Sequence, residues 1–311
     1  MSLSVKHILG AQDLSREDIE TILDSALSFR ELSTRPIKKA PALRGKTVIN
    51  LFFEPSTRTR TSFEIAGKRL SADVINIAGS SSSTVKGENL IDSARVLEAM
   101  NPDILVVRHS SSGAAHLISQ HVDCPVINAG DGAHEHPTQA LLDLMTLRDH
   151  KNSLDGLNVV IVGDIANSRV ARSNIHAMKT MGMSVTVVAP PTLLPSKIEE
   201  MGVSVSYDLE ASLKTADAVM MLRIQSERQD RSPFPNLREY ANLFCLTYDK
   251  LRGSKEDLLV IHPGPVNRGV EIALDVMEGP RSVILNQVTN GVAVRMALMY
   301  LLLGGKDEAD N

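Results

Sequence analysis

Residues 47–61, which read TVINLFFEPSTRTRT, place the pattern of a buried strand directly before the start of a helix. Residues 47–53 are rich in β-branched and aromatic side chains, as is typical of a strand, and Glu54-Pro55 ends the run. A strand that leads through a short loop into a helix is the first half of a βαβ unit. The stretch therefore predicts a parallel sheet covered by helices.

The same alternation of strand and helix patterns continues on both sides of this stretch. Upstream, Ser15 begins a predicted helix, and Asp18 three residues later forms a weaker variant of the capping box. Short apolar runs predict further strands at 74–77, 104–107, 126–127, 159–162, 185–188, 203–205, 218–222 and 258–261. Helical patterns lie at 61–70, 90–100, 140–150, 170–181, 197–201, 209–215 and 288–303.

The predicted fold class is α/β, with two doubly wound domains that each hold a mainly parallel sheet flanked by helices. A length of 311 residues favours two domains rather than one. The polar break at 151–156 separates the two sets of strands. We therefore expect a first domain over residues 1–150 and a second over residues 151–285.

Composition excludes several classes of function. With 33 Lys plus Arg against 37 Asp plus Glu the net charge is −4, and Trp is absent, so no nucleic-acid partner is indicated. Cys124 and Cys245 provide neither a disulfide framework nor the spacing of metal ligands. Residues 1–15 carry no signal-peptide pattern, and no apolar run reaches the roughly 18 residues of a membrane helix. A soluble, cytoplasmic protein without a membrane partner is predicted.

The run Ser56-Thr57-Arg58-Thr59-Arg60-Thr61 predicts an anion site. It follows a strand and opens a helix, where main-chain N–H groups point outward and carry partial positive charge. Hydroxyl and guanidinium donors beside those N–H groups suit the oxygens of a phosphate. Ordinary helix capping explains one or two of these residues but not the unbroken run.

Arginine follows several other predicted strands. Besides Arg58, such residues are Arg108, Arg169 and Arg223. In open parallel sheets ligands bind beyond the carboxyl ends of the strands. Four arginines at equivalent positions in a chain of negative net charge therefore predict a cleft of positive potential, which suits a small substrate with several negative charges.

Two further motifs follow strands. His136-Pro137-Thr138-Gln139 opens a helix, where the helix dipole favours a neutral imidazole that can donate to a carbonyl oxygen. Residues 262–265, HPGP, form a stiff loop that exposes main-chain carbonyl groups. His134 and His136 point to different sides of an extended segment, so a metal site is disfavoured.

A nicotinamide enzyme is also disfavoured. Residues 159–164, VVIVGD, resemble the beginning of a dinucleotide fingerprint. Ile165 and Ser168, however, stand where that fingerprint requires its second and third glycines.

Residues 52–59, FFEPSTRT, resemble the carbamoyl phosphate signature of the aspartate and ornithine carbamoyltransferases. Arg108-His-Ser and His136-Pro-Thr-Gln139 also fit this family, and the resemblance extends from Leu14 to Leu303. Residues 86–88, KGE, and 223–225, RIQ, resemble loops of the members that use aspartate. The ornithine members usually carry HCLP where this chain has HPGP, and a cationic side chain would need carboxylates rather than Arg169 and Arg223.

The resemblance implies a division of labour among the site residues. The residues expected to bind carbamoyl phosphate are Ser56, Thr57, Arg58, Thr59, Arg108, His136, Gln139, Gly264 and Pro265. The residues expected to bind aspartate are Lys86, Arg169, Arg223 and Gln225. Catalytic roles are implied for Arg58, Thr59, Lys86, Arg108 and His136. Ser82 and Lys86 would reach the site from an adjacent subunit, which implies a homotrimer.

The implied reaction transfers the carbamoyl group of carbamoyl phosphate to the amine of L-aspartate and needs no metal and no organic cofactor. The resemblance also implies that the terminal helix, residues 286–306, packs back onto the first domain. Ornithine transfer and a non-catalytic phosphometabolite-binding protein are the alternatives. The sequence leaves open a larger assembly with regulatory or dihydroorotase chains.

Overall fold

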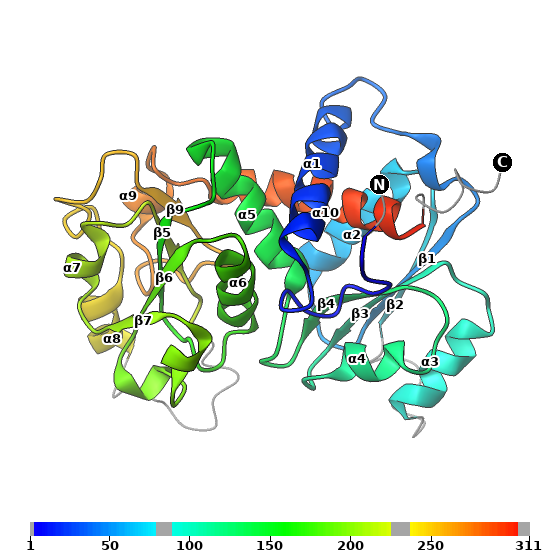
Figure 1. The fold of residues 1–311 in the computed structure, drawn as a ribbon, viewed down its shortest axis with the longest axis horizontal. Coiled ribbons are helices and arrows are strands. Elements are labelled where there is room, and N and C mark those ends of the chain that lie inside the picture. Colours follow the sequence, from blue (N-terminus) through cyan, green and yellow to red (C-terminus); the bar gives the residue numbers. More distant parts are fainter. Residues whose placement is uncertain (1–2, 79–88, 225–236, 304–311) are drawn as a thin grey trace. The chain divides into compact units, whose positions relative to one another are not determined.

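The computed structural model describes residues 3–78, 89–224 and 237–303, which form two compact units (Figure 1). The first unit contains residues 1–142 and 289–311, and the second contains residues 143–288. Helices α5 (Pro137–Lys151) and α10 (Ile284–Leu303) join them, because each division falls inside one of these helices. The polar break at 151–156 begins at the end of α5. The boundary between the two compact units, after Leu142, therefore lies a little before this break.

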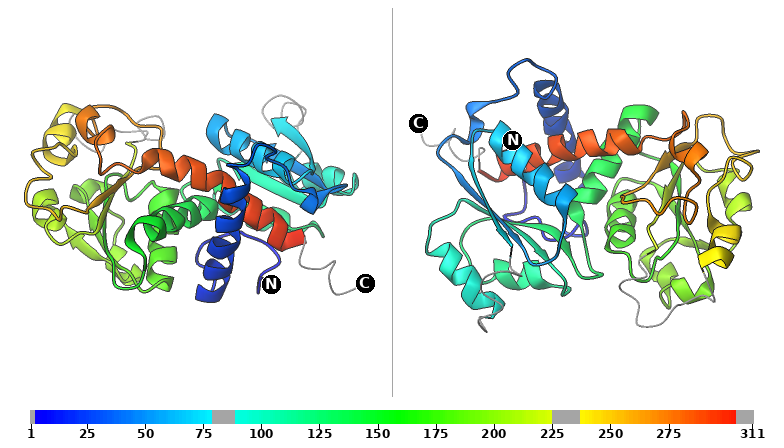
Figure 2. Two further views of the ribbon diagram at one scale, coloured as in Figure 1. Left: turned by 90° about the horizontal axis from the view of Figure 1, so that it is seen from above. Right: turned by 180° about the vertical axis from the view of Figure 1, so that it is seen from behind.

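The sheet of the first unit has the strand order β2-β1-β3-β4, and its pairs are all parallel. Its strands are β1 (Thr47–Phe52), β2 (Asp73–Ala78), β3 (Ile104–His109) and β4 (Val126–Asp131). The helices in or entering this unit are α1 (Arg16–Leu32), 3₁₀ helix η1 (Pro41–Leu43), α2 (Thr57–Arg69), α3 (Leu90–Glu98), α4 (Ala114–Ser119), α5 and α10. Helices cover both faces of the sheet (Figure 2).

Strand alternation places the core of the first unit. Ile49 and Leu51 of β1, with Leu105 and Val107 of β3, point to one face and pack against α3 and α4 in a cluster of buried side chains. The intervening β1 residues Val48, Asn50 and Phe52 point to the other face and are buried as well. Such continuous burial is typical of a parallel strand between two helical layers.

The sheet of the second unit has the order β7-β6-β5-β8-β9 and is also parallel. Its strands are β5 (Asn158–Val162), β6 (Ser184–Val188), β7 (Ser204–Ser206), β8 (Ala218–Met221) and β9 (Leu259–Ile261). Its helices are α6 (Arg169–Thr180), η4 (Pro191–Leu193), η5 (Ile198–Met201), α7 (Leu209–Leu213), α8 (Leu237–Phe244) and α9 (Leu274–Met277). The predicted fold class is thus confirmed.

Two predicted helices differ in the structure. Helix α2 begins at Thr57 rather than Thr61, because Ser56 has extended backbone angles and the helix starts directly after it. Residues 198–201 form a 3₁₀ helix, bounded by Lys197 and Gly202 at φ of 60° and 74°. Among the described residues no helix is long and apolar enough to cross a membrane.

Candidate active site

The predicted site residues of the first unit lie at or just beyond the carboxyl ends of three neighbouring strands. Arg58 lies in the first turn of α2, after β1; Arg108 lies in β3, opposite Phe52; and His136 directly precedes α5, after β4. Because β1, β3 and β4 are adjacent and parallel, these residues lie together at the carboxyl-terminal end of the sheet. Strand β2, which follows β1 in the chain, pairs with one side of β1, and β3 pairs with the other side. The carboxyl ends of β1 and β3 therefore form a topological switch point.

The start of α2 offers main-chain donors. Ser56 precedes the helix with φ −159° and ψ 96° and makes no side-chain capping hydrogen bond. The first helical bond runs from the N–H of Arg60 to the carbonyl of Ser56, at 3.2 Å. The N–H groups of residues 57–59 therefore precede the helical ladder, as at any helix start. Arg58 and Thr57 are exposed, and Ser56 and Thr59 are half-buried, so an anion can reach them.

Arg108 is held in a fixed orientation. Its Nη2 lies 2.9 Å from Oε2 of Glu54, and its Nη1 donates to the carbonyl of Ala129 at 3.0 Å. The residue is only 9% exposed, so both contacts are largely shielded from water. A planar guanidinium bound at two points keeps its remaining N–H groups in defined directions.

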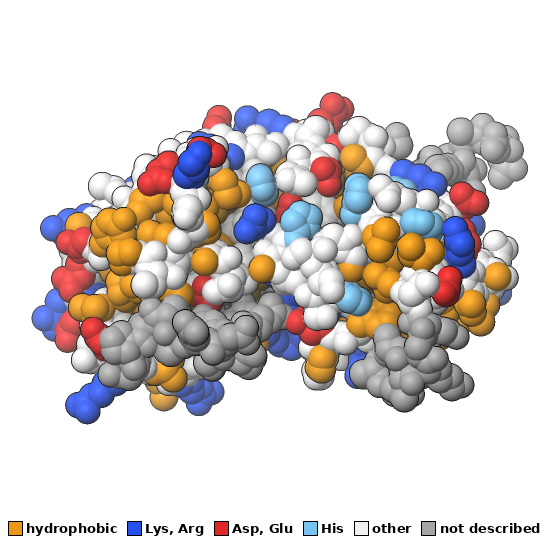
Figure 3. Space-filling view, turned by 90° about the horizontal axis from the view of Figure 1, so that it is seen from below, with side chains coloured by type: hydrophobic (Ala, Val, Ile, Leu, Met, Phe, Trp, Pro, Cys, Tyr) orange, Lys and Arg blue, Asp and Glu red, His pale blue; other side chains and the backbone are white. Residues whose placement is uncertain are grey.

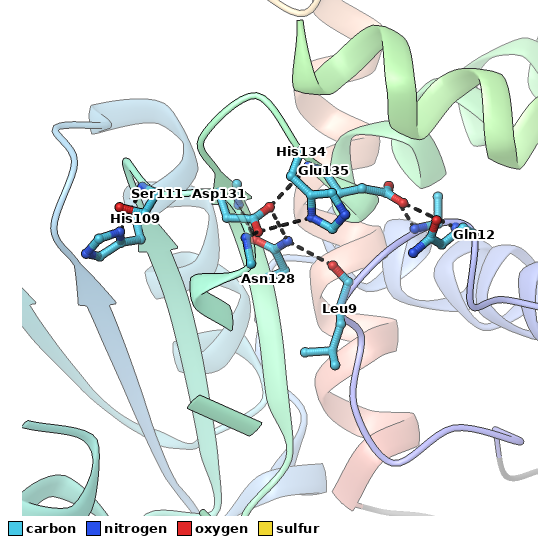
Figure 4. A network of polar contacts seen from close by, with 11 residues as sticks. Leu9, Gln12, His109, Ser111, Asn128, Asp131, His134 and Glu135 are labelled. Atoms are coloured by element: carbon cyan, nitrogen blue, oxygen red, sulfur yellow. Dashed lines mark hydrogen bonds and ion pairs between the residues drawn. The ribbon is translucent and has the colours of Figure 1, made fainter. Parts of the chain in front are cut away.

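The loop between β4 and His136 is organised by Asp131 (Figure 4). Oδ1 of Asp131 accepts from Asn128 Nδ2 at 2.8 Å and from the N–H of Glu135 at 3.1 Å. Its Oδ2 accepts from the N–H of Gly113 at 2.6 Å and lies 3.2 Å from Nδ1 of His134. One buried carboxylate thus sets the path of the chain that leads to His136.

Glu135 fastens the N-terminal segment to the same loop. Its fully buried carboxylate accepts from the N–H groups of Ala11, at 2.9 Å, and Gln12, at 3.4 Å. A Cβ at Gly10 would lie 2.7 Å from Oε1 of Glu135, so only glycine allows this approach without a shift. The segment around residue 10 therefore supports the loop before His136.

Histidine side chains reach the surface in several places on the face drawn in Figure 3. In the first unit, a depression of about 310 Å³ is lined by Leu9, Gln12, Asp13, Gly113, His116, Asp131 and His134. Within the described part of the chain, no group of three or more His, Cys, Asp or Glu side chains is placed to hold a metal ion.

His136 and Gln139 stand at the start of α5. The carbonyl of His136 accepts from the N–H of Gln139 at 2.9 Å, and Pro137 occupies the first helical position, where its missing N–H costs nothing. His136 is 5% exposed and Gln139 is 8% exposed. Both residues follow β4, so they lie at the same end of the sheet as Arg108.

The second unit repeats the arrangement. Arg169 opens α6 after β5, and the hydroxyl of Ser168 caps this helix by accepting from the N–H of Ala171. Arg223 follows β8, the strand beside β5, so both arginines lie at the switch point of the second sheet. A Cβ at Gly163, which has φ +127°, would lie 3.1 Å from Cβ of Leu222, so glycine allows the two strand ends to approach.

The loop after β9 carries Gly264 and Pro265 and is fixed by buried polar groups. Nδ1 of His262 accepts from the N–H of Gly264 at 2.7 Å, so the neutral ring has its proton on Nε2. That nitrogen lies 3.4 Å from Oε1 of Glu271, and both side chains are fully buried. Oε1 of Glu271 also accepts from the N–H of Asn267, at 2.9 Å.

The same loop is tied to two other segments. The N–H of His262 donates to Oε1 of Gln287 at 3.0 Å, and Nε2 of Gln287 donates to the buried Asp143 at 2.6 Å. Asn267 donates to the carbonyl of Ile224 at 3.3 Å, directly after Arg223. The loop therefore has a defined path relative to Arg223.

Ser82, Lys86 and Gln225 lie outside the described residues. The sequence did not predict the supporting roles of Glu54, Asp131 and Glu271. Each of them lies in or near one of the motifs described above. A carboxylate in such a place was the sequence feature that could have indicated a supporting residue.

Both halves of the chain match models of one family. Residues 6–149 match the aspartate/ornithine carbamoyltransferase carbamoyl-P binding domain. Residues 155–302 match the Asp/Orn binding domain of the same family.

Individual proteins are similar over nearly the whole chain. The aspartate carbamoyltransferase catalytic subunit of Syntrophus aciditrophicus (strain SB) is 62% identical over 299 residues, which are 96% of this chain and 97% of that protein. A Trypanosoma cruzi aspartate transcarbamoylase in complex with carbamoyl phosphate superposes with a TM-score of 0.86, at 31% identity and 95% coverage of both chains. Ornithine carbamoyltransferase from Pyrococcus furiosus also gives 0.86, at 30% identity, covering 98% of this chain and 99% of that one.

Proposed function

Because the chain belongs to the aspartate/ornithine carbamoyltransferase family, we propose that it transfers the carbamoyl group of carbamoyl phosphate to the amine of L-aspartate. The products are N-carbamoyl-L-aspartate and phosphate, and the reaction is the committed step of pyrimidine synthesis. The observation that carries the choice of aspartate is the 62% identity to a protein named as an aspartate carbamoyltransferase catalytic subunit. The folds alone do not discriminate, since the ornithine enzyme superposes equally well.

The first domain, which we place over residues 1–150 together with the terminal helix, binds carbamoyl phosphate. Ser56, Thr57, Arg58 and Thr59 hold the phosphate through main-chain N–H groups and side chains, with Arg108 from the neighbouring strand. The support is the exposed start of α2 and the anchored guanidinium of Arg108 at one sheet edge. Helix-start N–H groups and arginine are the donors that a phosphate dianion requires.

Thr59, Arg108 and His136 stabilise the oxygen of the carbonyl group as it becomes an oxyanion. Two of these donors are held by the protein, Arg108 by its contact with Glu54 and His136 by its place at the start of α5. Prearranged donors cost no reorganisation at the moment of reaction, and removing one typically lowers the rate about 10²–10³-fold.

Gln139 and the carbonyls of Gly264 and Pro265 orient the carbamoyl NH₂ group. The amide oxygen of Gln139 and the two main-chain oxygens are acceptors, which match the hydrogens of an NH₂ group. The buried pair His262–Glu271 supports the loop that presents these carbonyls. Orientation of this kind supplies much of the rate, since effective molarities of about 10⁵–10⁸ M are available to aligned groups.

The second domain, residues 151–285, binds aspartate. Arg169 and Arg223 hold its two carboxylates and Gln225 assists them, because arginine matches a carboxylate with two parallel hydrogen bonds. The uncharged amine attacks the carbonyl carbon, and the bond from that carbon to the phosphate oxygen breaks. The amine is itself the nucleophile, so no side-chain nucleophile is required, and the departing phosphate accepts its proton.

The active enzyme is a homotrimer in the cytoplasm. Ser82 and Lys86 reach the site of an adjacent subunit, where the lysine neutralises charge on both substrates. The cytoplasmic assignment is supported by the free and buried thiols of Cys124 and Cys245, which suit a reducing compartment.

Initial rates with carbamoyl phosphate and either aspartate or ornithine test the proposal. We expect carbamoyl-aspartate and phosphate to form in equal amounts, and no citrulline. Citrulline as the main product would establish the ornithine reaction. Binding of carbamoyl phosphate without turnover on either amino acid would instead establish a binding protein.

A further inference from the structure

Arg295 lies in α10, far in the sequence from Ser56–Thr59 and His136, yet it contacts the two helices whose starts carry or adjoin them, α2 and α5. It is 5% exposed. Its Nη1 donates to Oγ of Ser62 at 2.8 Å and to the carbonyl of Gly291 at 3.1 Å, while Nη2 donates to Oγ1 of Thr138 at 3.4 Å. All of these residues belong to the first unit.

Both side-chain partners lie within the first two turns of a helix. Ser62 stands in the second turn of α2, one turn after the helix start at residues 57–59. Thr138 stands in the first turn of α5, between His136 and Gln139. One guanidinium therefore bonds directly to both helices whose starts carry the proposed carbamoyl phosphate residues.

Arginine is the residue type that this position requires. Its planar group directs rigid N–H donors toward several acceptors at once, which the compact ammonium group of lysine does not do. The guanidinium carbon also lies 5.0 Å from the ring centroid of Phe63, the neighbour of Ser62, so the cation packs over an aromatic face on α2. A buried charge is expensive unless it is well bonded, so a shift of either helix is opposed by lost contacts.

Gly291 makes room for this group. A Cβ at residue 291 would lie 2.7 Å from Nη1 of Arg295 and 3.1 Å from Cδ2 of Leu142. The nearer atom is the end of a long side chain, so an alanine here displaces the guanidinium rather than the helix backbone.

We propose that Arg295 is a positioning residue that fixes the start of α2 relative to the start of α5, so that Ser56–Thr59 and His136 engage one carbamoyl phosphate. The proposal rests on the function assigned above. Helix α10 returns the chain to the first unit. In this way it supplies a cation that is bonded to both α2 and α5.

Arg295→Ala and Arg295→Lys test the proposal, with kcat, KM for carbamoyl phosphate and the urea unfolding midpoint measured for each. We expect Arg295→Ala to lower kcat about 10²-fold, the scale of a misplacement near 1 Å, and to raise KM for carbamoyl phosphate. Millimolar guanidinium chloride, far below denaturing concentrations, should restore part of kcat, whereas potassium chloride at equal ionic strength should not. Arg295→Lys should stay impaired, because an ammonium group cannot reach both hydroxyls in the same geometry.

Arg30→Ala is the matched control. Arg30 also donates to α10, to Oδ1 of Asn290 at 3.2 Å, but from α1, which carries no proposed ligand residue. It should affect the unfolding midpoint without the loss of kcat. If Arg295→Ala does not fold, Gly291→Ala provides the test, since it displaces the guanidinium and should reproduce the loss of kcat.

Undiminished kcat in the folded Arg295 variants, or in Gly291→Ala if Arg295→Ala does not fold, would overturn the proposal. A loss that guanidinium does not restore and that Arg30→Ala matches would overturn it too. Absence of carbamoyl transfer in the unmodified protein would refute the proposed function instead, so the two failures are distinguishable.

Discussion

Arg108 and His136 owe their positions to neighbours that take no part in the chemistry. Glu54 and the carbonyl of Ala129 hold the guanidinium of Arg108, and Asp131 sets the loop that leads to His136. These contacts lie within the protein itself, so they hold the donor groups in defined directions. Such preorganisation is the physical basis of the rate enhancement that we assign to the site.

Thr59→Val tests the oxyanion role of one hydroxyl. The substitution keeps the shape of the side chain and removes its donor, and Thr59 is half-buried, so we expect folding to persist. We predict a fall in kcat of about 10²–10³-fold in a steady-state assay. Thr61→Val, on an exposed position of the same helix, is the control and should retain full activity. Equal effects of the two substitutions would argue against the assignment.

Glu271 tests the support of the loop that carries Gly264 and Pro265. Glu271→Gln keeps an acceptor for Nε2 of His262 and for the N–H of Asn267, so turnover should stay within a few-fold. Glu271→Leu removes the acceptor, and we predict a loss of about 1–3 kcal/mol in unfolding free energy and about 10-fold or more in kcat. Glu278→Leu, at an exposed position, is the control. Full activity of Glu271→Leu would contradict the account.

The arginines at strand ends could be predicted from sequence because a strand and the residue after it are adjacent in the chain. Arg295 could not, because it acts through residues that only the tertiary fold brings near. It bonds to Ser62 across 233 positions and to Thr138 across 157. Periodicity and spacing carry no information about such pairs.

Helix starts are the elements on which the site is built. Helices α2, α5 and α6 all begin directly after a strand and its loop, and their first turns carry Arg58, Gln139 and Arg169. Their boundaries were harder to predict than their existence. The threonines of residues 57–61 are β-branched and have low helix propensity, which hides the first turn of α2 from a periodicity argument.

Helix α1 shows a helix start that the sequence did predict. The hydroxyl of Ser15 accepts from the N–H of Asp18, and the carboxylate of Asp18 accepts from the N–H of Ser15, which completes the predicted capping box. Burial alone would raise the pKa of Asp18, but hydrogen bonds from Ser4 and Ser15 outweigh it and hold the pKa below its ordinary value of 3.8.

Ser15→Ala should therefore destabilise the protein by about 1 kcal/mol in urea unfolding at neutral pH. The carboxylate of Asp18 stabilises the fold above its unfolded-state pKa, and this contribution is lost as the pH falls through the lower folded-state pKa. The cost of Asp18→Asn should accordingly shrink as the pH falls below 3.8. A cost that is the same at acidic and neutral pH would exclude the charge as its source.

At the scale of the whole molecule, the two units share one arrangement of strands and proposed ligand residues. Each unit has a doubly wound parallel sheet, and in each some of the proposed ligand residues lie at the ends of the two strands that flank the switch point. In the first unit these strands are β1 and β3, and in the second they are β5 and β8. The residues that we propose to bind a phosphate and two carboxylates are therefore found at strand ends, although they come from widely separated parts of the sequence.

The proposal that a neighbouring subunit completes the site has a specific consequence for mixtures of variants. Lys86→Ala should nearly abolish activity, and so should Arg58→Ala. When the two proteins are dissociated and reassembled together, some sites receive an intact Arg58 from one subunit and an intact Lys86 from another. We expect measurable activity in such mixed trimers. Verified mixed trimers without activity would refute the shared site and leave the individual residue roles to be tested separately.

The central claim is that the arginines at the strand ends bind both substrates. A crystal structure with a bisubstrate analogue tests it most directly. In this analogue a phosphonate is joined through an acetyl amide to aspartate. We predict that the phosphonate contacts residues 56–59 and Arg108, and that the two carboxylates contact Arg169 and Arg223. A well-ordered analogue bound away from these arginines would contradict the account.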